Sequence, residues 1–199
     1  MRALLFSILF GTFAHAQTGL EIPQYPSKFV VSNVPAGDVL NIRAAPNASS
    51  EDLGDFENGE ILEVIGTNPN GKWSQINFEE GEAWVVSAYL EPRAPERMEG
   101  SKLPLPLQCF GTEPFWQVEI TQGGFQFETP ENDSVFEHIT RDAHAFFDVT
   151  TALIETESYS ALIKYEGCSD GMSNRAYGLS ISLFLDSGVI GGCCSIVPN

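Results

Sequence analysis

The sequence predicts an all-β protein with two domains, a small closed barrel followed by a second antiparallel barrel or sandwich. Strand-like runs of about five residues recur along the chain, and glycine or asparagine turns separate them. No segment has a sustained helical period of about 3.6 residues. A proline-rich stretch at residues 92–106 divides the chain into two parts.

Length and charge limit what the protein can bind. Its 199 residues suffice for one or two domains, and 43% of them are hydrophobic, enough to fill a core. The formal net charge is −17, and acidic residues occur in both halves. This charge disfavours nucleic acid and anionic lipid as partners, because lysine and arginine bind both. It would attract a basic protein, although an acidic surface also serves plain solubility.

Residues 1–16 have the features of a cleaved signal peptide. Met1-Arg2 places a positive charge at the N-terminus, and residues 4–13 are apolar. Ala14-His15-Ala16 then has the small-x-small pattern of a signal-peptidase cleavage site. The apolar run is too short to span a bilayer, which takes about 20 residues. We therefore expect cleavage after Ala16, a periplasmic or secreted protein without a membrane anchor, and a lead-in at residues 17–28.

The first predicted domain, residues 29–91, is organised around the strand 40–43. Leu40 and Ile42 face one side of this strand, and Asn41 and Arg43 face the other. At least one tryptophan should fill the core, which is small in a barrel of about 60 residues. A polar loop is expected at residues 47–52, further strands at 29–31, 61–65, 73–78 and 83–86, and a closing segment at 87–90.

The outward residues of this domain are candidates for a binding groove. Asn41, Arg43, Trp73 and Tyr89 could line a groove for an extended peptide. Alternatively, Arg43 forms an ion pair with the acidic loop at Glu51-Asp52.

Several motifs follow one another in this part of the chain. They are Val39-Leu40-Asn41-Ile42-Arg43-Ala44-Ala45-Pro46, Gly71-Lys72-Trp73, Ala83-Trp84-Val85 and Tyr89-Leu90. The set resembles the bacterial SH3 (SH3b) family, which usually has a glycine where Ala83 stands. The resemblance covers about residues 29–91. It implies a binding module, often for cell-wall peptides, that is usually attached to another domain.

A linker and a second all-β domain are expected at residues 92–106 and 107–199. The linker is rich in proline, and its charges alternate in sign, so it should be a stiff tether between two separate bodies. Residues 145–155 could also hold a helical turn. Strand-like runs occur at 115–120, 125–129, 135–140, 146–153, 158–165, 177–185 and 189–194.

All four cysteines lie in the second half of the chain, and in an exported protein they should form disulfides. Cys193 and Cys194 are adjacent, so their side chains point to opposite faces of a strand. Each can therefore reach a different partner, and we expect the pairs Cys168–Cys193 and Cys109–Cys194. The opposite pairing, Cys109–Cys193 with Cys168–Cys194, stays open.

The second domain carries three further motifs. They are Gly111-Thr112-Glu113-Pro114-Phe115-Trp116, Cys168-Ser169-Asp170-Gly171-Met172-Ser173 with Arg175 and Tyr177, and Gly192-Cys193. These resemble an uncharacterised family of bacterial envelope proteins, which usually has aspartate at Asn174 and proline at Gly178. Because that family has no agreed activity, the resemblance implies a fold and a location without a chemistry.

The loops of the second domain could form a pocket. Glu113, Asp170 and Arg175 accompany the aromatic residues Trp116 and Tyr177 there. The carboxylates could perform acid–base chemistry or bind a cationic group. Alternatively, a salt bridge between Asp170 and Arg175 merely holds the loop.

No pattern of residues indicates catalysis or a cofactor. His138 and His144, with Asp142 or Asp148, could ligate a metal, but packed or solvent-facing histidines are more common. No serine–histidine–aspartate pattern, Cys-x-x-Cys motif or phosphate loop is evident. The sequence thus predicts a non-enzymatic binding protein of the bacterial envelope, without metal or cofactor, whose partner is cell-wall peptide or an envelope protein. The alternative is an acidic inhibitor of a basic cell-wall hydrolase of the lysozyme type.

Overall fold

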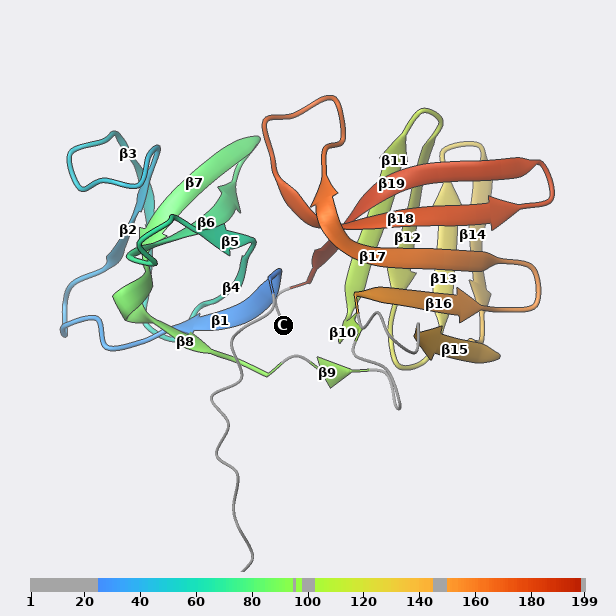
Figure 1. The fold of residues 1–199 in the computed structure, drawn as a ribbon, viewed down its shortest axis with the longest axis horizontal. Coiled ribbons are helices and arrows are strands. Elements are labelled where there is room, and N and C mark those ends of the chain that lie inside the picture. Colours follow the sequence, from blue (N-terminus) through green and yellow to red (C-terminus); the bar gives the residue numbers. More distant parts are fainter. Residues whose placement is uncertain (1–24, 95, 98–102, 145–149, 198–199) are drawn as a thin grey trace, which may run out of the picture.

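The computed structural model describes residues 25–94, 96–97, 103–144 and 150–197. It is all-β, as predicted, with two domains side by side (Figure 1). The expected signal peptide and most of the lead-in lie outside the described residues. Within the described part of the chain, no helix is long and apolar enough to cross a membrane.

The first domain consists of two antiparallel sheets around one core. One sheet has the order β4-β1-β8 and the other the order β3-β2-β7-β6-β5. A 3-10 helix at Ser87–Tyr89 joins β7 to β8. The strands are β1 (Ser27–Val31), β2 (Leu40–Arg43), β3 (Asp52–Phe56), β4 (Ile61–Val64), β5 (Gly66–Thr67), β6 (Trp73–Phe78), β7 (Gly81–Val86) and β8 (Leu90–Pro92).

The core of the first domain follows the predicted alternation. Leu40 and Ile42 are buried, whereas Asn41 is exposed. Neither Trp73 nor Trp84 fills the barrel, contrary to expectation, because both are half-buried. Their strand neighbours take the inward positions instead, since adjacent residues of a strand face opposite sides. The buried residues are Phe29, Val31, Val34, Leu40, Ile42, Leu62, Val64, Ile76, Ala83, Val85 and Leu90.

The second domain is a single antiparallel sheet of nine strands that curls into a half-barrel (Figure 1). Its strand order is β14-β13-β12-β11-β19-β18-β17-β16-β15. Residues 151–155 are a strand, so the possible helical turn does not form there. The strands are β11 (Leu107–Thr112), β12 (Phe115–Ile120), β13 (Phe125–Thr129), β14 (Asn132–Glu137), β15 (Arg141–His144), β16 (Thr151–Glu155), β17 (Ser160–Cys168), β18 (Tyr177–Leu185) and β19 (Gly188–Ile196).

The end of the expected linker belongs to the second domain. Strand β9 (Glu96–Arg97) pairs with β10 (Pro104–Leu105). Leu103 and Leu105 are buried in the core of the nine-stranded sheet. The packed part of the second domain therefore begins before residue 107.

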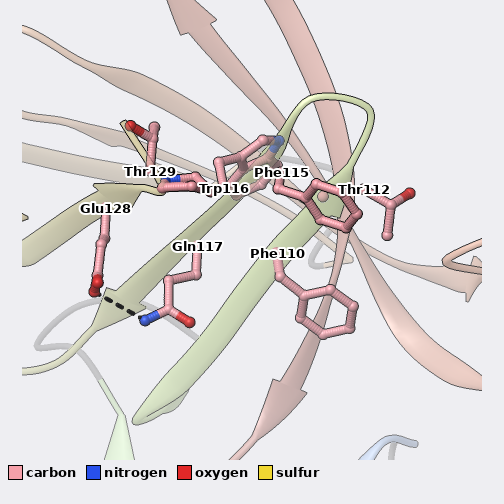
Figure 2. Close-up of a pocket in the computed structure, with 9 residues that line it drawn as sticks. Phe110, Thr112, Phe115, Trp116, Gln117, Glu128 and Thr129 are labelled. Atoms are coloured by element: carbon pink, nitrogen blue, oxygen red, sulfur yellow. Dashed lines mark hydrogen bonds between the residues drawn. The ribbon is translucent and has the colours of Figure 1, made fainter. Parts of the chain in front are cut away.

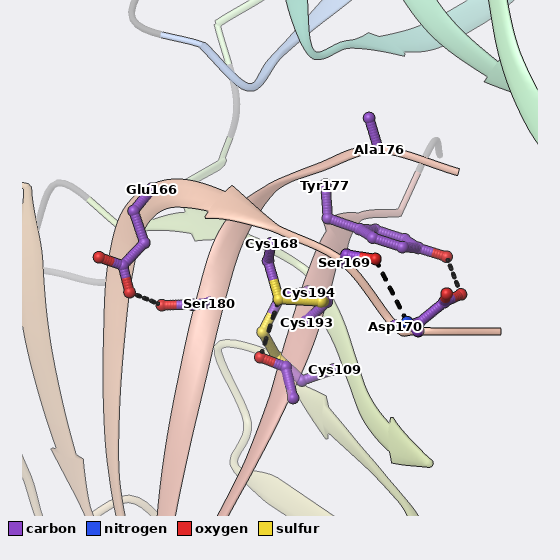
Figure 3. Close-up of a disulfide and its surroundings, with 12 residues drawn as sticks. Cys109, Glu166, Cys168, Ser169, Asp170, Ala176, Tyr177, Ser180, Cys193 and Cys194 are labelled. Atoms are coloured by element: carbon purple, nitrogen blue, oxygen red, sulfur yellow. Dashed lines mark hydrogen bonds between the residues drawn. A yellow bond between two sulfur atoms is a disulfide. The ribbon is translucent and has the colours of Figure 1, made fainter. Parts of the chain in front are cut away.

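Two disulfides hold β11, β17 and β19 together (Figure 3). They join Cys109 to Cys194 and Cys168 to Cys193, which is the pairing favoured from the sequence. Cys109 and Cys194 lie opposite each other in register and belong to the core. The second disulfide ties the end of β17, where the loop to β18 begins, to β19.

That loop joins the two domains, which are not separate bodies on a tether. The side chain of Asn77 makes two hydrogen bonds to the backbone of Ala176. Asn174 N–H donates to the Glu80 carbonyl at 3.0 Å. In Figure 1 the loop, in orange, reaches the start of β7, where Asn174 forms a bridge with Gly81. Polar contacts of this kind leave no hydrophobic periodicity, so the sequence pattern did not indicate them.

Candidate functional site

The four groove residues predicted in the first domain lie together. Asn41, Arg43, Trp73 and Tyr89 line one pocket of about 160 Å³. Asn41 and Arg43 come from β2, Trp73 starts β6, and Tyr89 ends the 3-10 helix. The other lining residues are Val34, Pro35, Asp38, Val39, Leu40, Ala48 and Val86. The pocket thus combines aromatic rings with a few polar groups, as grooves for peptides do.

Arg43 also forms the ion pair that was considered as the alternative. Its Nη1 atom lies 3.3 Å from Asp52 Oδ2 and donates to the Ser50 carbonyl at 3.2 Å. Asn41 Nδ2 donates to the same Asp52 oxygen at 3.2 Å. Lining a pocket and pairing with Asp52 are therefore compatible roles for Arg43. Asp52 therefore links both side chains at this wall of the pocket.

A comparison with protein families identifies this domain. Residues 38–91 match the family described as the bacterial SH3 domain. These residues are a bacterial SH3 domain. Strand β1 lies before the matched range, yet Phe29 and Val31 belong to the same core. SH3 domains are protein- and peptide-binding modules.

Two curated proteins share a short segment with the chain. Over 45 residues it is 40% identical to Tyrosine-protein kinase ABL2 of Homo sapiens and, equally, to that of Mus musculus. This segment is 23% of the present chain and 4% of each kinase. No solved structure matches the chain significantly. The resemblance of the second domain to envelope proteins therefore stays a prediction.

The structure separates the residues of the predicted second-domain pocket. Trp116 lines a groove on the second domain, whereas Asp170, Arg175 and Tyr177 line a cavity between the domains. Glu113 is exposed and lines neither space. The two spaces share Phe110 and Gln117, so they adjoin.

The groove on the second domain has an aromatic surface (Figure 2). Phe115 is 56% exposed, and Gln117 Nε2 donates to Glu128 Oε2 at 3.0 Å. Trp116 itself is buried and packs against Gly111 and Gly192. The groove has a volume of about 380 Å³ and is lined by Phe110, Gly111, Thr112, Phe115, Trp116, Gln117, Glu128, Thr129 and Pro130. Sequence reasoning missed Phe110, Gln117 and Glu128. Alternation along β12 is the signal that could have found Gln117, because it puts Gln117 on the same face as Phe115.

The cavity between the domains is larger, with a volume of about 560 Å³. Strands β4 and β6 of the SH3 domain form one side, and β11, β19 and the loop before β18 form the other. Its lining residues are Phe56, Ile61, Leu62, Glu63, Ile76, Asn77, Phe78, Glu79, Glu80, Gln108, Phe110, Gln117, Asp170, Arg175, Tyr177, Ser195, Ile196 and Val197.

Asp170 organises the loop that bounds this cavity (Figure 3). Its carboxylate accepts hydrogen bonds from the backbone N–H groups of Met172 and Ser173, both at 2.9 Å. It also accepts from Ser173 Oγ at 2.7 Å and from the Tyr177 hydroxyl at 3.3 Å. The hydrogen bond from the Ser173 N–H is the main cause that lowers the pKa of Asp170 to about 2. Asp170 holds the loop, but not through the salt bridge considered from the sequence, since no ion pair joins it to Arg175 among the described residues.

Arg175 and Glu63 are the notable charged groups of the cavity. The Arg175 guanidinium carbon lies 5.8 Å from the centre of the Tyr177 ring. Its Nε atom is buried and has no hydrogen-bond partner among the described residues. Glu63 is half-buried, and its Oε1 accepts from Ile196 N–H at 2.9 Å. Burial raises the pKa of Glu63 to about 7. Sequence reasoning missed Glu63, whose only signal was a charge within the apolar strand 61–65.

The histidines show no metal site in the described part of the chain. The ring of His138 contacts Phe136 edge-on, and its Nδ1 lies 3.2 Å from the Gly123 carbonyl. The His144 side chain and Asp148 lie outside the described residues. Among the side chains that the structure places, no three histidine, cysteine or acidic residues are arranged to hold a metal ion.

Proposed function

We propose that this protein is an exported, non-enzymatic binding protein of the bacterial cell envelope, and that its SH3 groove binds cell-wall peptide. The groove of Asn41, Arg43, Trp73 and Tyr89 carries this proposal. Trp73 and Tyr89 offer aromatic faces to an extended peptide, and Arg43 and Asn41 offer polar groups at one wall.

The two disulfides support a location outside the cytoplasm. Such bonds persist in oxidising compartments and are rare in the cytosol. All four cysteines are paired, and Cys109, Cys193 and Cys194 are buried. Together with the bacterial SH3 domain, they are consistent with an extracytoplasmic protein that meets the cell wall.

Sedimentation with purified, insoluble peptidoglycan tests the proposal on the full mature chain. The Trp73→Ala and Arg43→Gln variants should stay in the supernatant, whereas the unmodified protein should pellet. Trp84→Ala and Arg141→Gln are matched controls. Trp84 is half-buried in the same sheet but does not line the groove, and Arg141 pairs with Glu155 in the second domain. Both controls should pellet like the unmodified protein.

Two results would contradict the proposal. One is an unmodified chain that remains in the supernatant at low ionic strength. The other is a Trp73→Ala variant that folds, by circular dichroism, and still pellets fully.

Inhibition of a basic cell-wall hydrolase is the second candidate function. The net charge of −17 supports it, as does the turn between β6 and β7. Glu79 and Glu80 of this turn and Glu82 of β7 are exposed, and none forms an ion pair with a described residue. Such a row of charges attracts a basic protein at long range. A lytic assay with lysozyme at low salt tests this candidate, and an unchanged rate of lysis would reject it.

A further inference from the structure

The cavity between the two domains has the size and position of a ligand site. Its volume of about 560 Å³ falls within the range of about 300–1,000 Å³ common for small-molecule pockets. Such pockets are frequent at domain interfaces. Both domains contribute walls, and hydrogen bonds between Asn77 and Ala176 hold those walls together. The space is therefore built by the docked molecule and is absent from either domain alone.

The Nε atom of Arg175 lacks an acceptor in this cavity. Arg175 is the only basic side chain among the described lining residues, and its buried Nε atom has no hydrogen-bond partner among them. Glu63 is near enough for the charge of Arg175 to lower its pKa, against the larger effect of burial. The nearby Asp170 is directed at backbone N–H groups of its own loop. A buried donor without a partner destabilises the fold, so native structures rarely keep one without a reason. The planar guanidinium fits a carboxylate through paired hydrogen bonds.

The other charged residues of the lining are acidic, and much of the remaining wall is apolar. Glu79 and Glu80 are exposed, and neither forms an ion pair with a described residue. These acids would repel a simple anion but attract an ammonium group. Glu63 is already an acceptor for Ile196 N–H. Phe56, Ile61, Ile76 and Phe110 supply apolar wall between the charged groups.

We propose that the interdomain cavity binds a small zwitterion, namely an amino acid or a short peptide with a free carboxylate and a free ammonium group. The carboxylate bonds to Arg175, the ammonium group faces Glu79 and Glu80, and an apolar side chain contacts Phe56 and Phe110. This site differs from the SH3 groove and does not depend on what that groove binds. The occupant bridges the two domains and strengthens their contact.

Calorimetric titration with L-alanyl-L-leucine and two blocked forms tests the proposal. The dipeptide should bind to the full mature chain. The C-terminal amide of the dipeptide lacks the carboxylate, and the N-acetyl form lacks the ammonium group. Each of these two forms should bind at least about tenfold more weakly than the dipeptide. This comparison uses the unmodified protein, so it does not depend on whether any variant folds. Equal binding of the dipeptide and its amide, or no binding at millimolar concentration, would overturn the proposal.

Two variants locate the binding event. Arg175→Gln should lower the affinity about tenfold or more, because it removes the charge but keeps polar atoms. Arg141→Gln removes a charge from the same domain away from the cavity and should not change the affinity. In parallel, the amide NMR signals of Ile196 and Ala176 should shift on addition of the dipeptide. Binding that leaves both signals unchanged, or that survives Arg175→Gln in full, would contradict the site.

Discussion

Asn77 of β6 holds the backbone of Ala176 with both polar atoms of its side-chain amide. Asn77 Nδ2 donates to the Ala176 carbonyl at 2.8 Å, and Asn77 Oδ1 accepts from the Ala176 N–H at 3.0 Å. The side chain thus pairs with the Ala176 backbone as an adjacent strand would, although Ala176 is 99 residues away in sequence. A parallel bridge between Gly81 and Asn174 continues the same contact.

Replacing Asn77 should release the loop from the SH3 domain. Asn77→Ala removes both hydrogen bonds, which contribute about 0.5–1.5 kcal/mol each. Hydrogen exchange measured by NMR should therefore be faster at the Ala176 amide in this variant. Asn41→Ala is the control, because Asn41 lies in the SH3 groove and does not touch the loop. An Ala176 amide that stays equally protected in Asn77→Ala would show that the two hydrogen bonds do not hold the domains together.

Glu63 should make the protein less stable as the pH rises. Burial raises its pKa from 4.5 to about 7 in the folded protein, whereas the unfolded chain keeps the ordinary value. Between these values the folded state binds more protons, so its stability is full below pH 4.5 and is lost as the pH rises through about 7. The loss is on the order of 3 kcal/mol at most.

Urea denaturation at several pH values checks this expectation. The Glu63→Gln variant cannot ionise but keeps an oxygen that accepts from Ile196 N–H. It should therefore lose less stability than the unmodified protein between pH 4.5 and pH 7. Glu82→Gln changes an exposed acid of β7 and should behave like the unmodified protein. Parallel pH profiles for all three proteins would contradict the assignment.

The Cys168–Cys193 disulfide should stabilise both the second domain and the loop. Its two cysteines are separated by 25 positions, and the chain-entropy relation gives about 3.5 kcal/mol for a loop of that length. The Cys168→Ser/Cys193→Ser variant should unfold at a lower urea concentration. An unchanged midpoint would mean that the bond does not restrict the unfolded chain.

Gly111 and Gly192 leave room for the ring of Trp116. A Cβ atom at Gly192 would collide with the Phe110 carbonyl and lie 2.8 Å from the Trp116 ring. The Gly192→Ala variant should therefore lose about 1–3 kcal/mol of unfolding free energy. Gly167→Ala is the matched control, because no atom lies within 4 Å of its added Cβ. Thermal denaturation should separate the two variants, and equal melting temperatures would contradict this packing.

Most of the correct predictions rest on the alternation of side chains between the two faces of a strand. It placed Leu40 and Ile42 in the core and gave Cys193 and Cys194 different partners, because period-two geometry is local. The polar strand β3 (Asp52–Phe56) was missed, since its residues alternate poorly and its apolar side chains are only half-buried. The tryptophans were misplaced because their bulk suggested a core role that smaller neighbours fill.

Contacts between the domains could not be read from the sequence. Asn77 and Glu63 make polar contacts with backbone groups that are far away in sequence, and such contacts have no periodic pattern. The four residues predicted for the SH3 groove line one pocket, because their separate motifs belong to one bacterial SH3 domain. The interdomain cavity was not predictable, because it depends on how two independent cores dock.

The most direct test of the binding role is an NMR titration of the isotope-labelled mature chain with soluble stem peptide released from peptidoglycan. We predict that the largest shifts occur at Asn41, Arg43, Trp73 and Tyr89 and that they saturate. Absence of shifts, or shifts that avoid these four residues, would contradict the assignment of the SH3 groove as the peptide-binding surface.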